Sequence, residues 1–356
     1  MSFVRLAPEQ HDTLEGMPEP SENPHLVGHR ATRALLAGSH RAGRLPQGLI
    51  LAGPAGIGKA TLAFHLARHV LVHPDGAGAP ADLAPPDFAP PDIAGSLFRQ
   101  VASGAHPSVL HLTRPFNERS KSFKTVLAVD EIRRIGRFLS HTAHDGGWRV
   151  VIVDPADDMN VQAANALLKN LEEPPARTLF VLVTHGIGRL LPTLRSRCQA
   201  IMLGALAKEE LLAALDAVGA ELPTSAAEKS ALAARAGGSV RQALLLLEHG
   251  GLAIADAVER FAGASRLDVT EAHRLAEAVA GKGKEAPFRL LHEEALDLLS
   301  RAAADAAGRG DLSRAARLSE AWDAERVAGR EAAAYNLDRR LASLETLGRL
   351  HAALRL

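Results

Sequence analysis

Residues 48–59, GLILAGPAGIGK, decide the fold. The apolar run 48–52 predicts a short buried strand, and the pattern from Lys59 to about Val72 predicts a helix. Between them lies a glycine-rich turn, whose backbone N–H groups can face a polyphosphate while the helix N-terminus adds its positive end. A glycine turn that merely precedes a helix is the plain alternative. The phosphate-binding interpretation places ATP or ADP against four loop residues: Gly53, Gly56, Gly58 and Lys59.

The flanking sequence extends this strand and helix into an α/β domain. Further apolar runs predict strands at 109–112, 149–153 and 178–183, with helices at 132–140 and 161–171. This alternation favours a parallel sheet covered by helices. After about Gly204 the Ala- and Leu-rich sequence predicts helices only. The expected organisation is an N-terminal arm (1–23), an α/β nucleotide-binding-like domain (24–204), a helical lid (205–265) and an all-helical C-terminal domain (266–356).

The last predicted helix carries an apolar stripe. Its leucines recur at spacings of three and four residues, which places them on one helix face. We expect this face to be ordinary core rather than an oligomer seam. The stripe consists of Leu337, Leu341, Leu344, Leu347, Leu350 and Leu354.

Composition excludes several classes of protein. The 356 residues are 47% hydrophobic and 23% charged, which indicates a globular chain of more than one domain. Lys and Arg (41) balance Asp and Glu (41), so no whole-molecule basic field attracts nucleic acid. The single cysteine, Cys198, excludes an internal disulfide. No apolar run reaches the roughly 20 residues that span a bilayer, and the N-terminus lacks a signal-peptide pattern. We expect a soluble, cytoplasmic protein without a membrane partner.

Two catalytic parts of a nucleotide hydrolase are missing. Ala60 stands where a hydroxyl would ligate Mg²⁺. Thr61 offers a hydroxyl about 100° further round the helix, and we include it among the expected nucleotide contacts. Asp154 ends a predicted strand as the Mg²⁺-associated acid, but Pro155 follows where a glutamate would polarise the attacking water. The sequence therefore argues against efficient hydrolysis, and magnesium binding is left open.

The acids after Pro155 do not restore this function. Asp157 and Asp158 come too late in the chain to replace the missing glutamate without a rearranged turn. We expect them to face solvent and to cap the next helix.

Three segments carry a family resemblance. NALLKNLEEPP (165–175), LRSRC (194–198) and GGSVRQA (237–243) resemble bacterial clamp-loader subunits of the AAA+ class. The likeness covers about residues 24–245, and beyond them rests on helical character and NLDRR (336–340). It implies an AAA+ domain, a lid and a helical collar. It further implies a hetero-pentameric ring with motor (gamma or tau) and delta subunits, which places a sliding clamp on primed DNA.

Within this family the missing parts point to a stator rather than a motor. The resemblance implies that Arg197, in the Ser-Arg-Cys segment, reaches in trans to a neighbour's ATP; a surface salt bridge is the alternative. Thr184 matches the first sensor position, or satisfies a buried backbone group. Arg241 matches the second sensor, or lies on a solvated helix face.

Other interpretations remain open. An active motor-type ATPase would use Lys59 and Asp154 in cis, and a DNA-binding protein on the same fold would need a basic face. Many members of the family carry a four-cysteine zinc module after the phosphate loop. This chain has no cysteine there, so no zinc is predicted. Cys198 is expected to be a small packing residue rather than a reactive thiol.

Overall fold

The computed structural model describes residues 10–76, 79, 87–119, 121–140, 147–248, 250–335 and 337–355. They form two compact units, which meet in the sequence between Arg241 and Gln242. The domain limits at 204 and 265 stay predictions. The first nine residues of the arm, and the part of the proline-rich stretch 74–96 at 77–78 and 80–86, lie outside the described residues.

The first unit is built on a parallel sheet. Its strands are β1 (Gly48–Ala52), β2 (Val109–Leu112), β5 (Arg149–Val153), β6 (Thr178–Thr184) and β7 (Gln199–Met202). They lie in the order β2-β5-β6-β1-β7, and every neighbouring pair is parallel. This confirms the predicted α/β class. Strand β7 and the short hairpin of β3 (Phe116–Asn117) and β4 (Ser122–Phe123) were not predicted.

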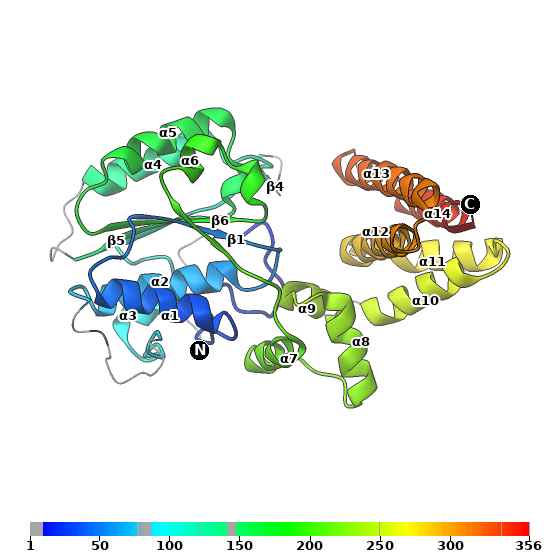
Figure 1. Cartoon of the computed structure of the whole chain (residues 1–356), viewed down its shortest axis with the longest axis horizontal. Coiled ribbons are helices and arrows are strands. Elements are labelled where there is room, and N and C mark those ends of the chain that lie inside the picture. Colours follow the sequence, from blue (N-terminus) through cyan, green and yellow to red (C-terminus); the bar gives the residue numbers. More distant parts are fainter. Residues whose placement is uncertain are drawn as a thin grey trace. The chain divides into compact units, whose positions relative to one another are not determined.

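Helices cover both faces of this sheet (Figure 1). On one face lie α1 (Arg30–Arg41), α2 (Lys59–Val72) and α3 (Ser96–Ala102); on the other lie α4 (Val129–Ser140), α5 (Val161–Glu172) and α6 (Pro192–Arg195). The strand side chains alternate between the two cores, so that Leu49 and Leu51 join the first and Ile50 and Ala52 the second. Burial on both faces explains why the strands are continuous apolar runs in the sequence.

Three short helices follow the sheet in the sequence. They are α7 (Lys208–Ala217), α8 (Ala226–Ala236) and α9 (Val240–Glu248). Ser225 caps α8 by accepting a hydrogen bond from Glu228 N, and Gly237 ends the helix in the left-handed region. Helix α9 begins in the first unit at the boundary with the second.

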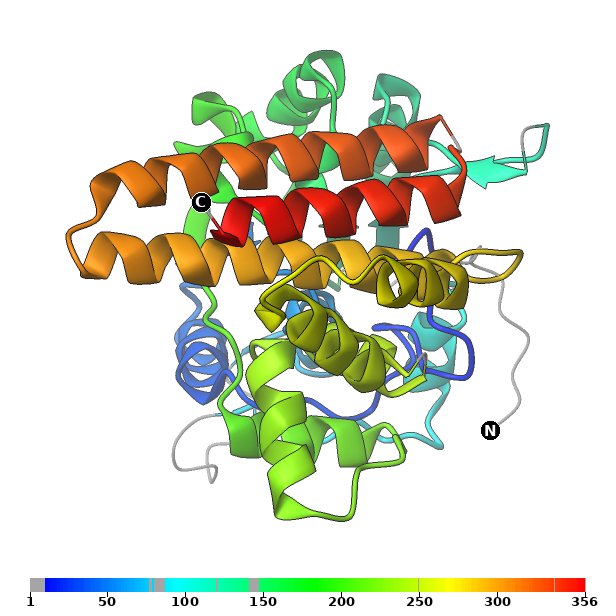
Figure 2. The ribbon, with the colours of Figure 1, turned by 90° about the vertical axis from the view of Figure 1, so that its right-hand side faces the viewer.

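The second unit is entirely helical in its described residues. It contains α10 (Gly251–Gly263), α11 (Val269–Val279), α12 (Glu285–Gly308), α13 (Leu312–Ala334) and α14 (Arg339–Arg355). Helices α12, α13 and α14 lie side by side (Figure 2). None of the described helices combines the length and the apolar character needed to cross a membrane.

The apolar stripe of the last helix is only partly core. Leu347 and Leu350 are buried, and Leu344 and Leu354 pack against them. Leu337 and Leu341 are 50% and 58% exposed, so the prediction of a continuous core face is wrong at its N-terminal end. The leucine spacing continues there, but Leu337 precedes α14 (Arg339–Arg355) and Leu341 lies in its first turn, beyond the side chains that form the core of this unit.

A buried polar cluster lies within the same unit. Glu325 of α13 is 2% exposed and accepts hydrogen bonds from Thr346 Oγ1 (2.7 Å) and Arg349 Nε (2.8 Å). Its Oε1 lies 2.6 Å from His292 Nδ1. Burial acts to raise the pKa of Glu325, but the hydrogen bonds from His292, Thr346 and Arg349 outweigh it and lower the pKa. One carboxylate thereby joins α12, α13 and α14.

Candidate nucleotide site and the Arg197 surface

The glycine loop lies between β1 and α2, as predicted, and is closely packed. Gly56 has φ +74, and a Cβ atom there would lie 2.3 Å from Ser239 Oγ. The Gly56 carbonyl accepts a hydrogen bond from Val240 N (2.9 Å), at the start of α9. Only glycine fits both the left-handed conformation and this close approach. The loop therefore has the backbone form of a phosphate cradle, with the N-terminus of α2 directed at it.

Lys59 is held across the loop. Its side chain is buried, with 4% of the residue exposed, and Nζ donates to the carbonyl oxygens of Gly53 (2.8 Å) and Pro54. Burial lowers the pKa of Lys59 to about 8, while the charges of Asp154 and Asp157 partly oppose this change. The ammonium group is still mostly charged at neutral pH. The predicted contact of Lys59 with a nucleotide phosphate stays a prediction.

Asp154 follows β5 and is joined to Pro155 by a cis peptide bond. Burial raises the pKa of Asp154 to about 7, and the nearby carboxylate of Asp12 adds to this effect, whereas His185 and Lys59 lower the pKa. Among the described residues, no group of three His, Cys, Asp or Glu side chains is arranged to hold a metal ion.

The predictions for nucleotide and magnesium at this loop stay open. Gly53, Gly56, Gly58 and Lys59 lie together between β1 and α2, and Thr61 lies in the first turn of α2; the nucleotide-binding role of all five stays a prediction. For a magnesium ion, the chain offers the carboxyl group of Asp154 but no hydroxyl ligand at Ala60.

The expectation for Asp157 and Asp158 is wrong. The Asp157 side chain is 2% exposed; it accepts a hydrogen bond from His185 N (3.2 Å) and pairs with Arg189 Nη1 (3.4 Å). Asp158 pairs with Arg114 Nε. Burial acts to raise the pKa of Asp157, but hydrogen bonds and charge from His185 outweigh it and hold the pKa below its usual range. Asn160 caps α5 instead, accepting a hydrogen bond from Ala163 N (2.8 Å).

Thr184 ends β6 beside the loop. It is fully buried, and its hydroxyl exchanges hydrogen bonds with the backbone O and N of Gly186, both at 3.2 Å. Its own carbonyl accepts from Gly53 N at 3.3 Å. Of the two predicted alternatives for Thr184, the structure shows the hydrogen bonding of a buried backbone group. The sensor role stays a prediction.

Arg241 lies beside the loop and contacts the N-terminal arm. Its backbone N is 3.4 Å from the Gly56 carbonyl oxygen. Its Nη1 donates to the backbone oxygen of Asp12 and lies 3.8 Å from the Asp12 carboxylate. No local sequence pattern connects Asp12 with Arg241, because 229 positions separate the two residues.

Arg197 lies on the surface just after α6. Its Nη2 donates to Glu172 Oε1 (2.8 Å), and its Nη1 donates to the Thr193 carbonyl (3.2 Å). The side chains of Arg197 and Glu172 are 38% and 51% exposed. The predicted alternative, a surface salt bridge, is thus present in this chain. It leaves part of the guanidinium open to solvent.

Cys198, the next residue, packs inward. It is 9% exposed, and burial raises the pKa of its thiol to about 11. The interpretation of Cys198 as a packing residue is confirmed.

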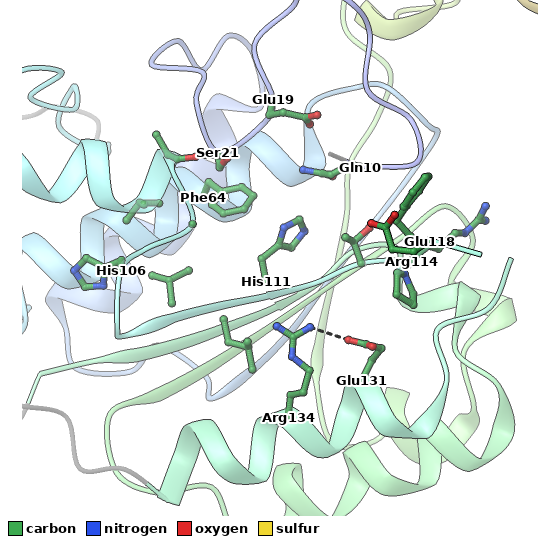
Figure 3. Close-up of a pocket in the computed structure, with 18 residues that line it drawn as sticks. Gln10, Glu19, Ser21, Phe64, His106, His111, Arg114, Glu118, Glu131 and Arg134 are labelled. Atoms are coloured by element: carbon green, nitrogen blue, oxygen red, sulfur yellow. Dashed lines mark hydrogen bonds and ion pairs between the residues drawn. The ribbon is translucent and has the colours of Figure 1, made fainter. Parts of the chain in front are cut away.

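Two features near the site were not predicted. His29, in the left-handed region with φ 52, places Nε2 2.7 Å from the Ile57 carbonyl oxygen and so braces the loop. A cavity of about 420 Å³ lies at the open edge of the sheet, between the arm (Gln10, Glu19) and β2 (Figure 3). His111 of β2 projects into the cavity (Figure 3), and no local sequence signal marks either feature.

The sheet order and the glycine loop after β1 define an AAA+ type P-loop fold. A family model described as DNA polymerase III, delta subunit, matches residues 28–207. The chain belongs to this family.

Individual relatives agree with this assignment. The chain is 41% identical to the DNA polymerase III subunit delta' of Pseudomonas aeruginosa over 168 residues, which are 46% of this chain and 46% of the relative. It is 34% identical to the subunit delta' of Escherichia coli over 165 residues, 46% of this chain and 44% of the relative. The matched part thus spans less than half the length of these relatives.

A solved structure resembles the chain more loosely. It is a DNA polymerase III gamma subunit-related protein from Thermotoga maritima, with 20% identity and a TM-score of 0.45. The comparison covers 90% of this chain and 99% of that one.

Proposed function

We propose that this chain is a delta-prime-type stator of a DNA polymerase III clamp loader. It assembles with gamma or tau motor subunits and a delta subunit, and the ring loads a sliding clamp on primed DNA. The chain supplies Arg197 in trans to a neighbour's ATP site and hydrolyses ATP poorly itself. The observation that carries the proposal is the half-exposed guanidinium of Arg197, anchored at two points on the surface.

The chemistry of arginine suits this role. A guanidinium stays charged near neutral pH, and its planar fork can bond two phosphate oxygens at once. An arginine supplied across an interface stabilises the transferring phosphoryl group and accelerates hydrolysis by about 10³–10⁵-fold. Contacts with Glu172 and Thr193 restrict the side chain of Arg197 and reduce the entropy lost on docking.

The chain's own site supports poor hydrolysis. Ala60 offers no hydroxyl ligand, and Pro155 offers no base. The loop can still hold ATP or ADP, since Lys59 and the glycine backbone keep a phosphate-binding form.

The test is a reconstituted ring with gamma and delta subunits, assayed for ATP hydrolysis and clamp loading. Arg197→Ala is expected to lower both at least 10-fold while the ring still assembles. Arg197→Lys should fail similarly, because a point charge lacks the planar fork. Arg195→Ala, which removes an exposed arginine two positions away, is the matched control. Wild-type loading by the Arg197→Ala ring would refute the proposal, as would brisk ATP hydrolysis by the isolated chain that Lys59→Ala abolishes.

A further inference from the structure

The N-terminal arm reaches the candidate nucleotide site through a short, internally bonded turn. Gln10 N donates to Thr13 Oγ1 (3.0 Å), and Thr13 N donates to the Gln10 carbonyl (3.2 Å). The Thr13 hydroxyl also contacts Glu19 of the same arm. These bonds fix residues 10–13 as one turn, with Asp12 near its tip.

The arm is in turn fastened to the scaffold. The Ser21 hydroxyl donates to the Ala102 carbonyl (3.3 Å), and Arg68 of α2 donates to the Ser21 carbonyl. His65 Nε2 lies 3.1 Å from the Asn23 carbonyl oxygen. The position of Asp12 is therefore set by packing on α2 and α3 and not by its own contacts alone.

Asp12 contacts Arg241 directly. Its backbone oxygen accepts a hydrogen bond from Arg241 Nη1, and its carboxylate lies 3.8 Å from the same guanidinium. The backbone N of Arg241 approaches the carbonyl of Gly56, and the charge of Asp12 contributes to the raised pKa of Asp154. A carboxylate 3.8 Å from a guanidinium competes with a phosphate for that guanidinium, and the backbone of Arg241 adjoins the loop where a phosphate would bind.

We propose that Asp12 is an internal competitor for nucleotide: its carboxylate engages Arg241, and a phosphate group bound at the Lys59 loop must displace it. This inference rests on the proposed phosphate-binding role of the loop. It is independent of Arg197, so failure here leaves the stator proposal intact. The arm thereby sets how weakly the isolated chain binds ATP or ADP.

The competition has a defined energetic scale. The side chains of Asp12 and Arg241 are 47% and 26% exposed, so their attraction is partly screened by water. Removing the carboxylate also removes its repulsion of an incoming polyphosphate. Together these effects predict nucleotide affinity about threefold to tenfold higher without the charge.

The experiment uses the full chain and a fluorescent ATP analogue as probe. Asp12→Asn keeps the backbone contact and the size of the side chain but removes its charge. We expect it to lower the dissociation constant about threefold to tenfold. Glu15→Gln removes a nearby charge for which no ion pair occurs among the described residues, and it should leave the dissociation constant unchanged.

Two further variants make the result decisive. The double variant Asp12→Asn/Lys59→Ala must lose the increase in nucleotide affinity, because that increase depends on phosphate binding at the loop. In an Asp216→Asn chain, which loses an exposed carboxylate of α7 and keeps both Asp12 and Arg241, affinity should remain at the wild-type value. Equal affinity of the wild-type and Asp12→Asn chains overturns the proposal, including the case in which neither binds. An increase in nucleotide affinity that persists in the double variant with Lys59→Ala also overturns the proposal. So does an equal increase in the Glu15→Gln chain.

Discussion

Arg197 and Glu172 join two segments that lie 25 positions apart in the chain, through a hydrogen bond of 2.8 Å between Nη2 and Oε1. Glu172 is the last residue of α5, and Arg197 follows α6, so the pair links two helices on the same face of the sheet. A carboxylate bound to a guanidinium fixes its direction but competes with any phosphate that approaches it. Glu172 therefore restrains the Arg197 side chain, and a phosphate group can still replace Glu172 as the partner of the guanidinium.

Glu172→Gln is expected to change the free energy of unfolding by less than about 1 kcal/mol, because the ion pair is largely exposed. Chemical denaturation measures this change. Glu173→Gln removes the neighbouring carboxylate and serves as the control. A loss of several kcal/mol in Glu172→Gln alone would mean that the pair is a structural requirement and not an exchangeable restraint.

Asp154→Asn should flatten the pH dependence of stability. The pKa of Asp154 is about 7 in the folded chain and near 3.8 when unfolded, so the folded state holds an extra proton between these values. Wild-type stability therefore falls as pH rises from about 4 to 7, by about 2–4 kcal/mol from this group. The variant should lack this loss, as urea unfolding at pH 5, 6 and 7 can measure. Asp216→Asn, an exposed site in α7, should keep the wild-type slope.

Glu325→Ala should destabilise the second unit by about 3 kcal/mol, because it leaves buried partners on α12 and α14 unsatisfied. The chain has two tryptophans, so a Trp148→Phe background leaves Trp322 of α13 as the reporter of urea unfolding. Glu320→Ala, an exposed site on the same helix, should change stability by less than about 0.5 kcal/mol. Equal midpoints for the two variants would contradict the structural role of the cluster.

The pKa of Glu325 also gives this cluster a pH dependence. Because the folded pKa lies below its usual value, the stabilisation is present above the unfolded pKa and is lost as pH falls through the folded one. The difference between wild type and Glu325→Ala should therefore shrink in acid.

Leu341→Glu should weaken assembly of the proposed ring without unfolding the chain. Leu341 is 58% exposed, and Leu337 beside it is 50% exposed, so a charge there meets water in the free chain but would be buried against a neighbouring subunit. Co-elution with gamma and delta subunits, together with thermal melting, tests this. As the control, Leu312→Glu places the same charge at a 72% exposed site at the start of α13. Co-elution of the Leu341→Glu variant at the level of this control and of the wild type would show that the Leu341 surface is not an interface.

The parts predictable from sequence are those with local causes. The bounds of β1 and α2 follow from an apolar run, a glycine turn and a helical period that adjoin one another. The prediction that Cys198 is a packing residue is also local, because a small, mostly apolar side chain next to a predicted strand is usually buried. The family segments around Arg197 likewise lie within short stretches of chain.

The parts that escaped prediction depend on distant partners. Asp157 is buried because His185 and Arg189, from a separate segment, approach it. Leu337 and Leu341 share the period of Leu347 but lie outside the packed core. Asp12 and His29 reach the loop only through the fold, since nothing in their neighbouring residues indicates a contact with it.

Several carbonyl groups of the glycine loop accept hydrogen bonds within the folded chain. Gly53 accepts from Lys59, Gly56 from the first turn of α9, and Ile57 contacts His29 before α1. The loop therefore bonds to α2, to α9 and to the segment before α1 whether or not a nucleotide is present. Gly53 and Gly56 also have no room for a Cβ atom, so a chain that had given up ATP altogether would still need glycine at these two positions to fold, and their presence alone is no measure of catalytic competence.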